Sequence, residues 1–176
     1  MEQAFAAAAR AADVVITSGG VSVGEADHVK QMLDRLGEVL FWKIAMKPGR
    51  PLAYGRIGAA HFFGLPGNPV AVMMTFYQFV RDALLVLQGR TEIEPVPTFK
   101  ATLGAPIRKA PGRTEFQRGI LSRDSAGNLS VRVTGEQGSG ILRSMSEANC
   151  FIIMPTEQGN VASGALVEVQ VMEGVI

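Results

Sequence analysis

The chain has 176 residues, 47% of them hydrophobic, and it carries a formal net charge of +1. With 20 glycines and 9 prolines, this composition is that of a globular chain with many turns, and it excludes a disordered or fibrous protein. A charge this close to neutral gives no support to a nucleic-acid partner or to binding of an acidic membrane surface.

Cysteine and histidine are scarce in this sequence. Its one cysteine, Cys150, lies in an apolar run at residues 150–154, where a buried structural thiol is expected rather than a nucleophile. Two histidines add too few ligands for a zinc cluster. No apolar run approaches the roughly 20 residues of a membrane span, and the first residues lack the charged-then-apolar pattern of a signal peptide. We therefore expect a reducing, cytoplasmic setting without a membrane partner.

The first part of the chain predicts a helix, a strand and a glycine-rich loop. Residues 2–11 are strong helix formers, and residues 12–16 indicate a short buried strand. Residues 17–24, Thr-Ser-Gly-Gly-Val-Ser-Val-Gly, then lead into a helical pattern that begins at Glu25. Such a loop can form an anion site because free backbone N–H groups and the helix dipole point outward together. A plain strand-to-helix turn without a ligand explains the same residue types equally well.

A helix and a second strand follow this loop. Residues 25–36 place apolar side chains at helical spacing, and Gly37 is expected to end the helix. His28 is expected near its exposed side. Residues 38–46 alternate as a strand.

The five residues after the second strand form a basic turn. Their sequence is Lys-Pro-Gly-Arg-Pro, and the two prolines fix a stiff conformation that presents Lys47 and Arg50 together. In a parallel sheet this turn would share one edge with the loop at residues 17–24. We therefore expect a shared anionic ligand, with Lys47 as a point charge and Arg50 as a fork donor. Cations in loops are otherwise commonly just solvated.

A second strand-to-helix junction is expected further along the chain. Residues 52–55 and 61–65 indicate two short apolar strands, and His61 is expected to be structural. The Pro-Gly-Asn-Pro sequence at residues 66–69 then introduces a long apolar helix, with Asn68 at the N-cap and proline at the first helical position. Open α/β sheets bind ligands at the carboxyl ends of their strands, so the two junctions and the basic turn predict a crevice for an anion.

Charge and prolines interrupt the helical pattern at residues 90–98. We therefore expect an α/β domain at residues 1–92 and a second domain at residues 93–176. Residues 124–128 indicate a hairpin turn, and residues 144–149 a short helical turn. Five short strands in this length predict a small all-β barrel or sandwich. These strands are expected at residues 98–103, 114–122, 129–134, 150–154 and 166–172.

Several motifs along the chain resemble one known family. TSGGVSVGEADHVK, MKPGRPLAYG and FFGLPGNPVAV are similar, in order and spacing, to three signatures of the molybdopterin molybdenumtransferases (MoeA, and the E domain of gephyrin). GRTEFQRG at residues 112–119 and GEQGSGILRSMSEAN at residues 135–149 resemble the C-terminal domain of that family. The resemblance covers nearly the whole chain. It implies the fold class α/β, with part of a MogA-like, three-layer pterin-binding domain on a mostly parallel sheet, followed by a small all-β, barrel-like C-terminal domain.

The resemblance also implies a reaction. Members of the family cleave AMP from adenylylated molybdopterin with the help of Mg²⁺ and insert molybdenum from molybdate to give molybdenum cofactor. By carry-over, Asp27 and Glu25 would hold the metal, since hard cations prefer carboxylate oxygens. Asp27, Lys47 and Arg50 would act in catalysis, the two cations by offsetting phosphate or molybdate charge. The residues expected to bind pterin and phosphate groups are Ser18, Gly19, Gly20, Ser22, Gly24, Pro66, Gly67, Asn68 and Ser139.

Alternatives stay open for some of these residues. Ser139 is equally explained as a plain loop serine, and Arg113 with Glu115 as a surface ion pair. Arg50 stands where many members of the family have lysine, a change that keeps the charge but alters the hydrogen-bond geometry.

Family members have two further domains and an earlier pterin-domain portion with a Gly-Asp-Glu motif, which this sequence lacks. We therefore expect a truncated first domain with an open sheet edge, and poor turnover by this chain alone. The family site lies between subunits, so a homodimer is expected. The alternative is a non-catalytic pterin-binding or scaffold module, a role that the gephyrin domain also serves. The presence of Asp27 and Lys47 beside the anion loop favours the enzyme.

Overall fold

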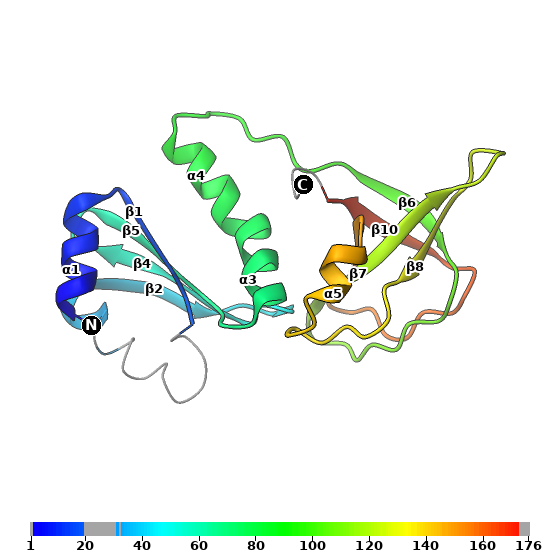
Figure 1. Cartoon of the computed structure of the whole chain (residues 1–176), viewed down its shortest axis with the longest axis horizontal. Coiled ribbons are helices and arrows are strands. Elements are labelled where there is room, and N and C mark those ends of the chain that lie inside the picture. The colour runs from blue at the N-terminus through cyan, green and yellow to red at the C-terminus, as the bar shows by residue number, and fades with distance from the viewer. Residues whose placement is uncertain (1, 20–30, 32, 173–176) are drawn as a thin grey trace. The chain divides into compact units, whose positions relative to one another are not determined.

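A computed structural model describes residues 2–19, 31 and 33–172 of the chain. The chain forms two compact units, the first made of Met1–Ile44 and Gly49–Thr91 and the second of Ala45–Pro48 and Glu92–Ile176 (Figure 1). The short segment Ala45–Pro48, which the sequence assigns to the first domain, is therefore part of the second unit.

The first unit is built on a mixed sheet of strands in the order β1-β5-β4-β2. β1 and β5 are parallel, whereas β4 is antiparallel to both of its neighbours. The expectation of a mostly parallel sheet is thus wrong for the described strands. β4 and β5 are joined by residues 58 and 59 alone, and so short a connection joins antiparallel strands because a parallel crossover needs a dozen residues or more. The elements are α1 (Glu2–Ala11), β1 (Val14–Ser18), β2 (Gly37–Lys43), β4 (Pro51–Ile57) and β5 (Ala60–Leu65).

Helices cover both faces of this sheet, which confirms the expected three-layer α/β arrangement. On one face, Phe5 of α1 packs against Phe62 of β5, with the ring centroids 5.8 Å apart. Leu33 is buried in the same cluster. Apolar residues on one side of α1 therefore fix it to the sheet.

On the other face lies the long helix predicted after residue 68. It consists of α3 (Pro69–Thr75), a π-helical segment η1 (Phe76–Val80) and α4 (Arg81–Leu87). Val80 packs in one cluster with Leu52 of β4 and with Phe63 and Leu65 of β5. The π-helical turn within the helix was not foreseeable from residue spacing alone.

Among the described residues, Pro69–Leu87 is one helix that is long and apolar enough to cross a membrane, by length and composition. This corrects the expectation that no apolar run approaches that length. Core helices pass the same test, but only 28% of this apolar window is buried, including Val70, Met74 and Val80, and a single such helix says little by itself. The helix is therefore only weak evidence for a membrane span.

The second unit is a closed barrel of five strands with one short strand added. Its strands follow the order β3-β7-β8-β6-β10-β9, and β7 also pairs with β9, which closes the ring. This confirms the expected barrel, and the short helix is present as well. The elements are β3 (Met46–Lys47), β6 (Thr98–Leu103), β7 (Thr114–Arg123), β8 (Leu129–Val133), α5 (Arg143–Glu147), β9 (Cys150–Met154) and β10 (Leu166–Val171).

The barrel interior is apolar and closely packed around Gly119 and Cys150. A Cβ added to Gly119 would lie 3.0 Å from the Val131 side chain, 3.1 Å from Cys150 Sγ and 3.1 Å from the Ile152 side chain. Cys150 is fully buried, and its burial raises the pKa of the thiol to about 11. The prediction of a structural thiol at this position is confirmed.

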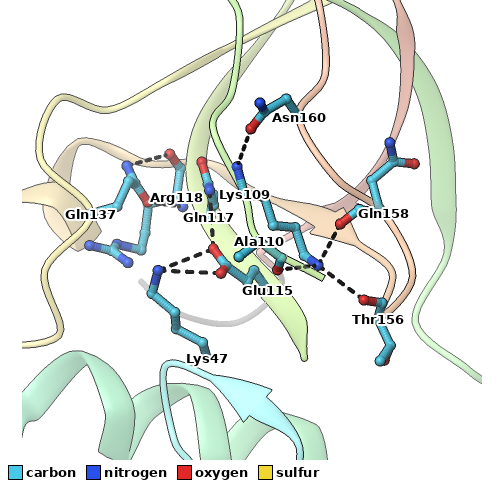
Figure 2. A network of polar contacts seen from close by, with 10 residues as sticks. All are labelled: Lys47, Lys109, Ala110, Glu115, Gln117, Arg118, Gln137, Thr156, Gln158 and Asn160. Atoms are coloured by element: carbon cyan, nitrogen blue, oxygen red, sulfur yellow. Dashed lines mark hydrogen bonds and ion pairs between the residues drawn. The ribbon is translucent and has the colours of Figure 1, made fainter. Parts of the chain in front are cut away.

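A buried lysine joins two loops at the end of the barrel. Lys109 is 6% exposed, and its Nζ donates to the backbone carbonyls of Gln158 at 2.8 Å, Ala110 at 3.3 Å and Thr156 at 3.4 Å (Figure 2). Its backbone N–H donates to Asn160 Oδ1 at 3.0 Å. These contacts fix the segment that leads into β7.

Candidate functional site

The carboxyl ends of β1 and β5 lie side by side in the first unit. Ser18 is in register with Leu65, and the Gly19 N–H donates to the Leu65 carbonyl at 3.0 Å. Gly19 has φ +85°, a conformation that glycine adopts without strain. A Cβ added to Gly67 would lie 3.6 Å from Gly19 Cα, so the first glycine of the Gly/Ser loop and the Pro-Gly-Asn-Pro turn are neighbours.

The turn at residues 66–69 starts the long helix, as the sequence predicts. Asn68 is in extended conformation at the N-cap, Pro69 is the first helical residue, and the Asn68 carbonyl accepts the N–H of Val72 at 2.9 Å. The first N–H groups of such a helix have no partner within the helix. N–H groups of this kind commonly bind anions in proteins, and an anion site at this edge of the sheet stays a prediction.

The connection after β2 leaves the sheet at the same edge. β2 and β5 are both antiparallel to β4, so they run in one direction, and Lys43 at the end of β2 is in register with Pro51 at the start of β4. Arg50 is exposed immediately before Pro51, and its carbonyl accepts the N–H of Ile44 at 3.1 Å. Arg50 thus lies at the sheet edge that carries Gly19, although only one of the pairings is parallel.

Lys47 belongs to the second unit. The two residues of β3 pair in parallel with the start of β7, where Lys47 is in register with Glu115. Lys47 Nζ lies 3.3 Å from both carboxylate oxygens of Glu115 (Figure 2). Arg50 is part of the first unit, so a joint role of Lys47 and Arg50 at one anion stays a prediction.

Glu115 has a partner and a degree of burial that the sequence did not predict. It is 6% exposed, it binds Lys47 and not Arg113, and its Oε2 also accepts Gln117 Nε2 at 3.4 Å. The interpretation of Arg113 and Glu115 as a surface ion pair is therefore wrong. The alternation of β7 was the available signal, because Glu115 and Gln117 share a face with Gly119, which packs in the barrel interior.

The loop that carries Ser139 is fixed from beneath by Arg118. The Arg118 guanidinium is buried and donates to the carbonyls of Gly138 at 3.0 Å and Glu136 at 3.4 Å, and to Ser144 Oγ at 3.0 Å. Burial lowers the pKa of Arg118 from its ordinary value. Ser139 itself is half-buried.

Gln137 completes the anchoring of this loop. Its side-chain Oε1 accepts the Arg118 N–H at 2.7 Å, and its Nε2 donates to the Arg118 carbonyl at 3.2 Å (Figure 2). Nε2 also donates to the Thr134 carbonyl at 3.2 Å. Both Arg118 and Gln137 were missed at the sequence level, since neither stands in a pattern that signals chemistry by itself.

The expected metal ligands, Glu25 and Asp27, lie outside the described residues. The same is true of Gly20, Ser22, Gly24 and His28. Within residues 2–19, 31 and 33–172, no group of three or more histidine, cysteine, aspartate or glutamate side chains could hold a metal ion. His61 makes a 2.9 Å hydrogen bond through Nδ1 with the Tyr54 hydroxyl, in keeping with the structural role expected for it.

The fold defines a class of protein: a three-layer α/β domain followed by a five-stranded barrel. Residues 1–86 match the family model described as "Probable molybdopterin binding domain", and residues 100–172 match "MoeA C-terminal region (domain IV)". The chain belongs to the molybdopterin molybdenumtransferase family (MoeA and gephyrin), of which it contains these two regions.

Curated relatives and solved structures agree with this assignment. A molybdopterin molybdenumtransferase of Haemophilus influenzae is 47% identical over 169 residues, which cover 96% of this chain and 42% of the relative. Gephyrin of Dictyostelium discoideum is 33% identical over 89% of this chain and 25% of the relative. A molybdopterin biosynthesis moeA protein from Pyrococcus horikosii superimposes with a TM-score of 0.78 at 29% identity, over 98% of this chain and 40% of that structure. The chain thus spans less than half the length of these relatives.

Proposed function

We propose that this chain is the substrate-binding part of a molybdopterin molybdenumtransferase in molybdenum cofactor biosynthesis. The reaction is the insertion of molybdenum from molybdate into adenylylated molybdopterin, with release of AMP. The observation that carries the proposal is the closeness of Gly19 and Gly67 at the carboxyl ends of β1 and β5, which places the end of β1 beside the start of the long helix. The name and 47% identity of the Haemophilus relative support it.

Backbone N–H groups would bind the anionic parts of the substrate. The loop that begins at Ser18 and Gly19, continued by Gly20, Ser22 and Gly24, would hold one phosphate or pterin group. Pro66, Gly67 and Asn68 would hold another at the start of α3. Because N–H donors at a helix N-terminus are fixed in place before binding, they need no reorganisation when the anion arrives.

Side chains would supply the remaining charge and orientation. Lys47 would place a compact positive charge beside the phosphoryl or molybdate group, and Arg50 would bind two anion oxygens at once. Ser139, on the loop fixed by Arg118, would donate a hydrogen bond to the same substrate. Arg118 itself is buried under that loop and would act through it.

A divalent cation completes the proposed site. Asp27 and Glu25 carry the carboxylate oxygens that Mg²⁺ prefers, and they would hold it next to the Gly/Ser loop. When bound, the cation would polarise the phosphoryl group that is cleaved.

Turnover is best measured in a chimera. This chain spans only 42% of the Haemophilus enzyme, so the remaining parts of the enzyme have to be supplied. In the chimera, the chain would replace the matching 169-residue region of that enzyme. We expect Mg²⁺-dependent AMP release from adenylylated molybdopterin and molybdate. Asp27→Asn is expected to abolish release while pterin binding is kept. A chimera that folds and binds the pterin nucleotide but releases no AMP would contradict the proposal.

The match to gephyrin supports a second candidate function, a pterin-binding or scaffold module without catalysis. It predicts the outcome just named, binding without turnover. In either case we propose a homodimer, with Ser139 facing the pterin domain of the other subunit. Sedimentation equilibrium over a concentration series distinguishes monomer from dimer.

A further inference from the structure

The Lys47–Glu115 pair joins two segments that are 68 positions apart in the sequence. Parallel pairing of β3 with β7 sets the distance, supported by the Thr114 N–H, which donates to the Ala45 carbonyl at 3.0 Å. The ammonium then lies 3.3 Å from each oxygen of the Glu115 carboxylate. Two equal contacts hold it between the oxygens and restrict its position more than a single contact would.

The two partners differ sharply in exposure. The Glu115 side chain is 7% exposed, whereas that of Lys47 is 49% exposed. A carboxylate buried to this extent needs a partner, because an unpaired charge away from water is strongly destabilising. Lys47 supplies that partner, and Gln117 Nε2 supplies a further hydrogen bond at 3.4 Å.

The pair leaves Lys47 able to bind a second anion. An ammonium has three N–H donors, and the two contacts to Glu115 occupy at most two of them. With half of its side chain exposed, Lys47 presents the remaining donor to solvent. The carboxylate therefore orients the ammonium without covering it.

We propose that Glu115, supported by Gln117, is a positioning residue that aims the Lys47 ammonium at the anionic substrate. The inference rests on the function proposed above, in which Lys47 offsets substrate charge. Glu115 acts through Lys47 and touches no reacting atom. Its negative charge also lowers the affinity of Lys47 for simple anions, so the substrate is bound by its full set of contacts rather than by this cation alone.

Residue-resolved lysine labelling tests the contact on the 176-residue chain itself. The chain is treated with limiting acetic anhydride, and each lysine is quantified by mass spectrometry. Removal of the ion-pair partner in Glu115→Gln is expected to raise labelling of Lys47 about threefold relative to exposed Lys100. Glu157→Gln is the matched control, because it removes the same charge from an exposed position of the same unit and should leave Lys47 unchanged.

Two further variants separate positioning from folding. Glu115→Asp keeps the charge and is expected to restore part of the protection of Lys47. Gln117→Ala keeps the carboxylate and is expected to give a smaller rise than Glu115→Gln. If circular dichroism shows that Glu115→Gln is unfolded, labelling of Glu115→Asp and Gln117→Ala decides whether Glu115 restrains Lys47. Equal labelling of Lys47 in the wild type and in every folded variant would overturn the proposal.

Kinetics in the chimera provide the functional readout. Glu115→Gln is expected to lower kcat for AMP release about tenfold, as for a misplaced group, while KM stays constant or falls. Glu115→Asp should recover part of this loss, and Glu157→Gln should behave as wild type. An unchanged kcat in Glu115→Gln would overturn the positioning role. A wild-type chimera that releases no AMP would instead contradict the proposed function, and the labelling result would still decide whether Glu115 restrains Lys47.

Discussion

Gly67 lies against Gly19 where two parallel strands end, close enough that a Cβ on Gly67 would meet Gly19 Cα at 3.6 Å. The two glycines are 48 positions apart in the sequence, Gly19 directly after β1 and Gly67 in the turn that starts the long helix. This contact is the physical basis of the proposed anion site.

Gly19→Ala is expected to weaken binding of phosphate-bearing ligands. Gly19 has φ +85°, and a Cβ on it would lie more than 4 Å from every described neighbour, so alanine would strain the backbone by about 1–2 kcal/mol without a clash against these residues. Gly58→Ala is the matched control, since Gly58 has φ +58°, also in open space, in the turn at the opposite edge of the sheet. Calorimetric titration with a phosphate-bearing ligand should show a lower affinity than wild type only for Gly19→Ala. Equal affinities in the two variants would contradict a role for this loop.

Gly119→Ala is expected to destabilise the barrel by about 1–3 kcal/mol, because the new methyl group would overpack the core. Three side chains lie 3.0–3.1 Å from the position of its Cβ. Gly159→Ala, in the same unit and with nothing within 4 Å, should change the free energy of unfolding little. Urea denaturation of both variants measures the difference, and equal midpoints would show that the barrel relaxes around the methyl group.

Lys109→Met is expected to cost about 2–3 kcal/mol of stability, since the carbonyls of Ala110, Thr156 and Gln158 would lose the charged donor that joins them. Lys100→Met serves as the control. Lys100 is exposed, and its only ion pair in the part of the chain described here is a 4.0 Å contact to Glu168, so its loss should change stability by less than about 0.5 kcal/mol. Thermal unfolding compares the two, and similar losses in both variants would contradict the role assigned to Lys109.

The buried thiol predicts alkaline destabilisation. Burial raises the pKa of Cys150 from 9.0 to about 11, so between these values the unfolded chain loses the thiol proton before the folded chain does. Stability is therefore expected to be complete below pH 9 and to fall by roughly 2–3 kcal/mol as the pH rises to 11. Cys150→Ala should lack this part of the pH dependence. Identical profiles for the two proteins would show that Cys150 does not contribute.

Local chemistry in the sequence predicted much of the fold. The apolar runs at β5 and β9, the Asn68–Pro69 helix start and the short turn after Ile57 each depend on neighbours in the chain, and each is found in the structure. The expectation of a mostly parallel sheet is wrong because that short turn forces β4 and β5 to be antiparallel.

The remaining features depend on contacts between distant residues. β3 has only two residues, and its assignment to the second unit follows from pairing with β7, which no local pattern indicates. The partner of Glu115 was missed for the same reason. Lys109 stands alone among loop residues, so its carbonyl partners in the other loop, Thr156 and Gln158, appear only when the two loops are brought together.

The most direct test of the central claim is an NMR titration of the ¹⁵N-labelled chain with adenylylated molybdopterin, with AMP as a separate comparison. If the junction of β1 and β5 binds the pterin nucleotide, the backbone amides of Gly19, Gly67 and Asn68 should shift with added ligand, while that of Gly58 at the opposite edge stays in place. Saturable shifts confined to other parts of the chain, with these three amides unchanged, would contradict the account.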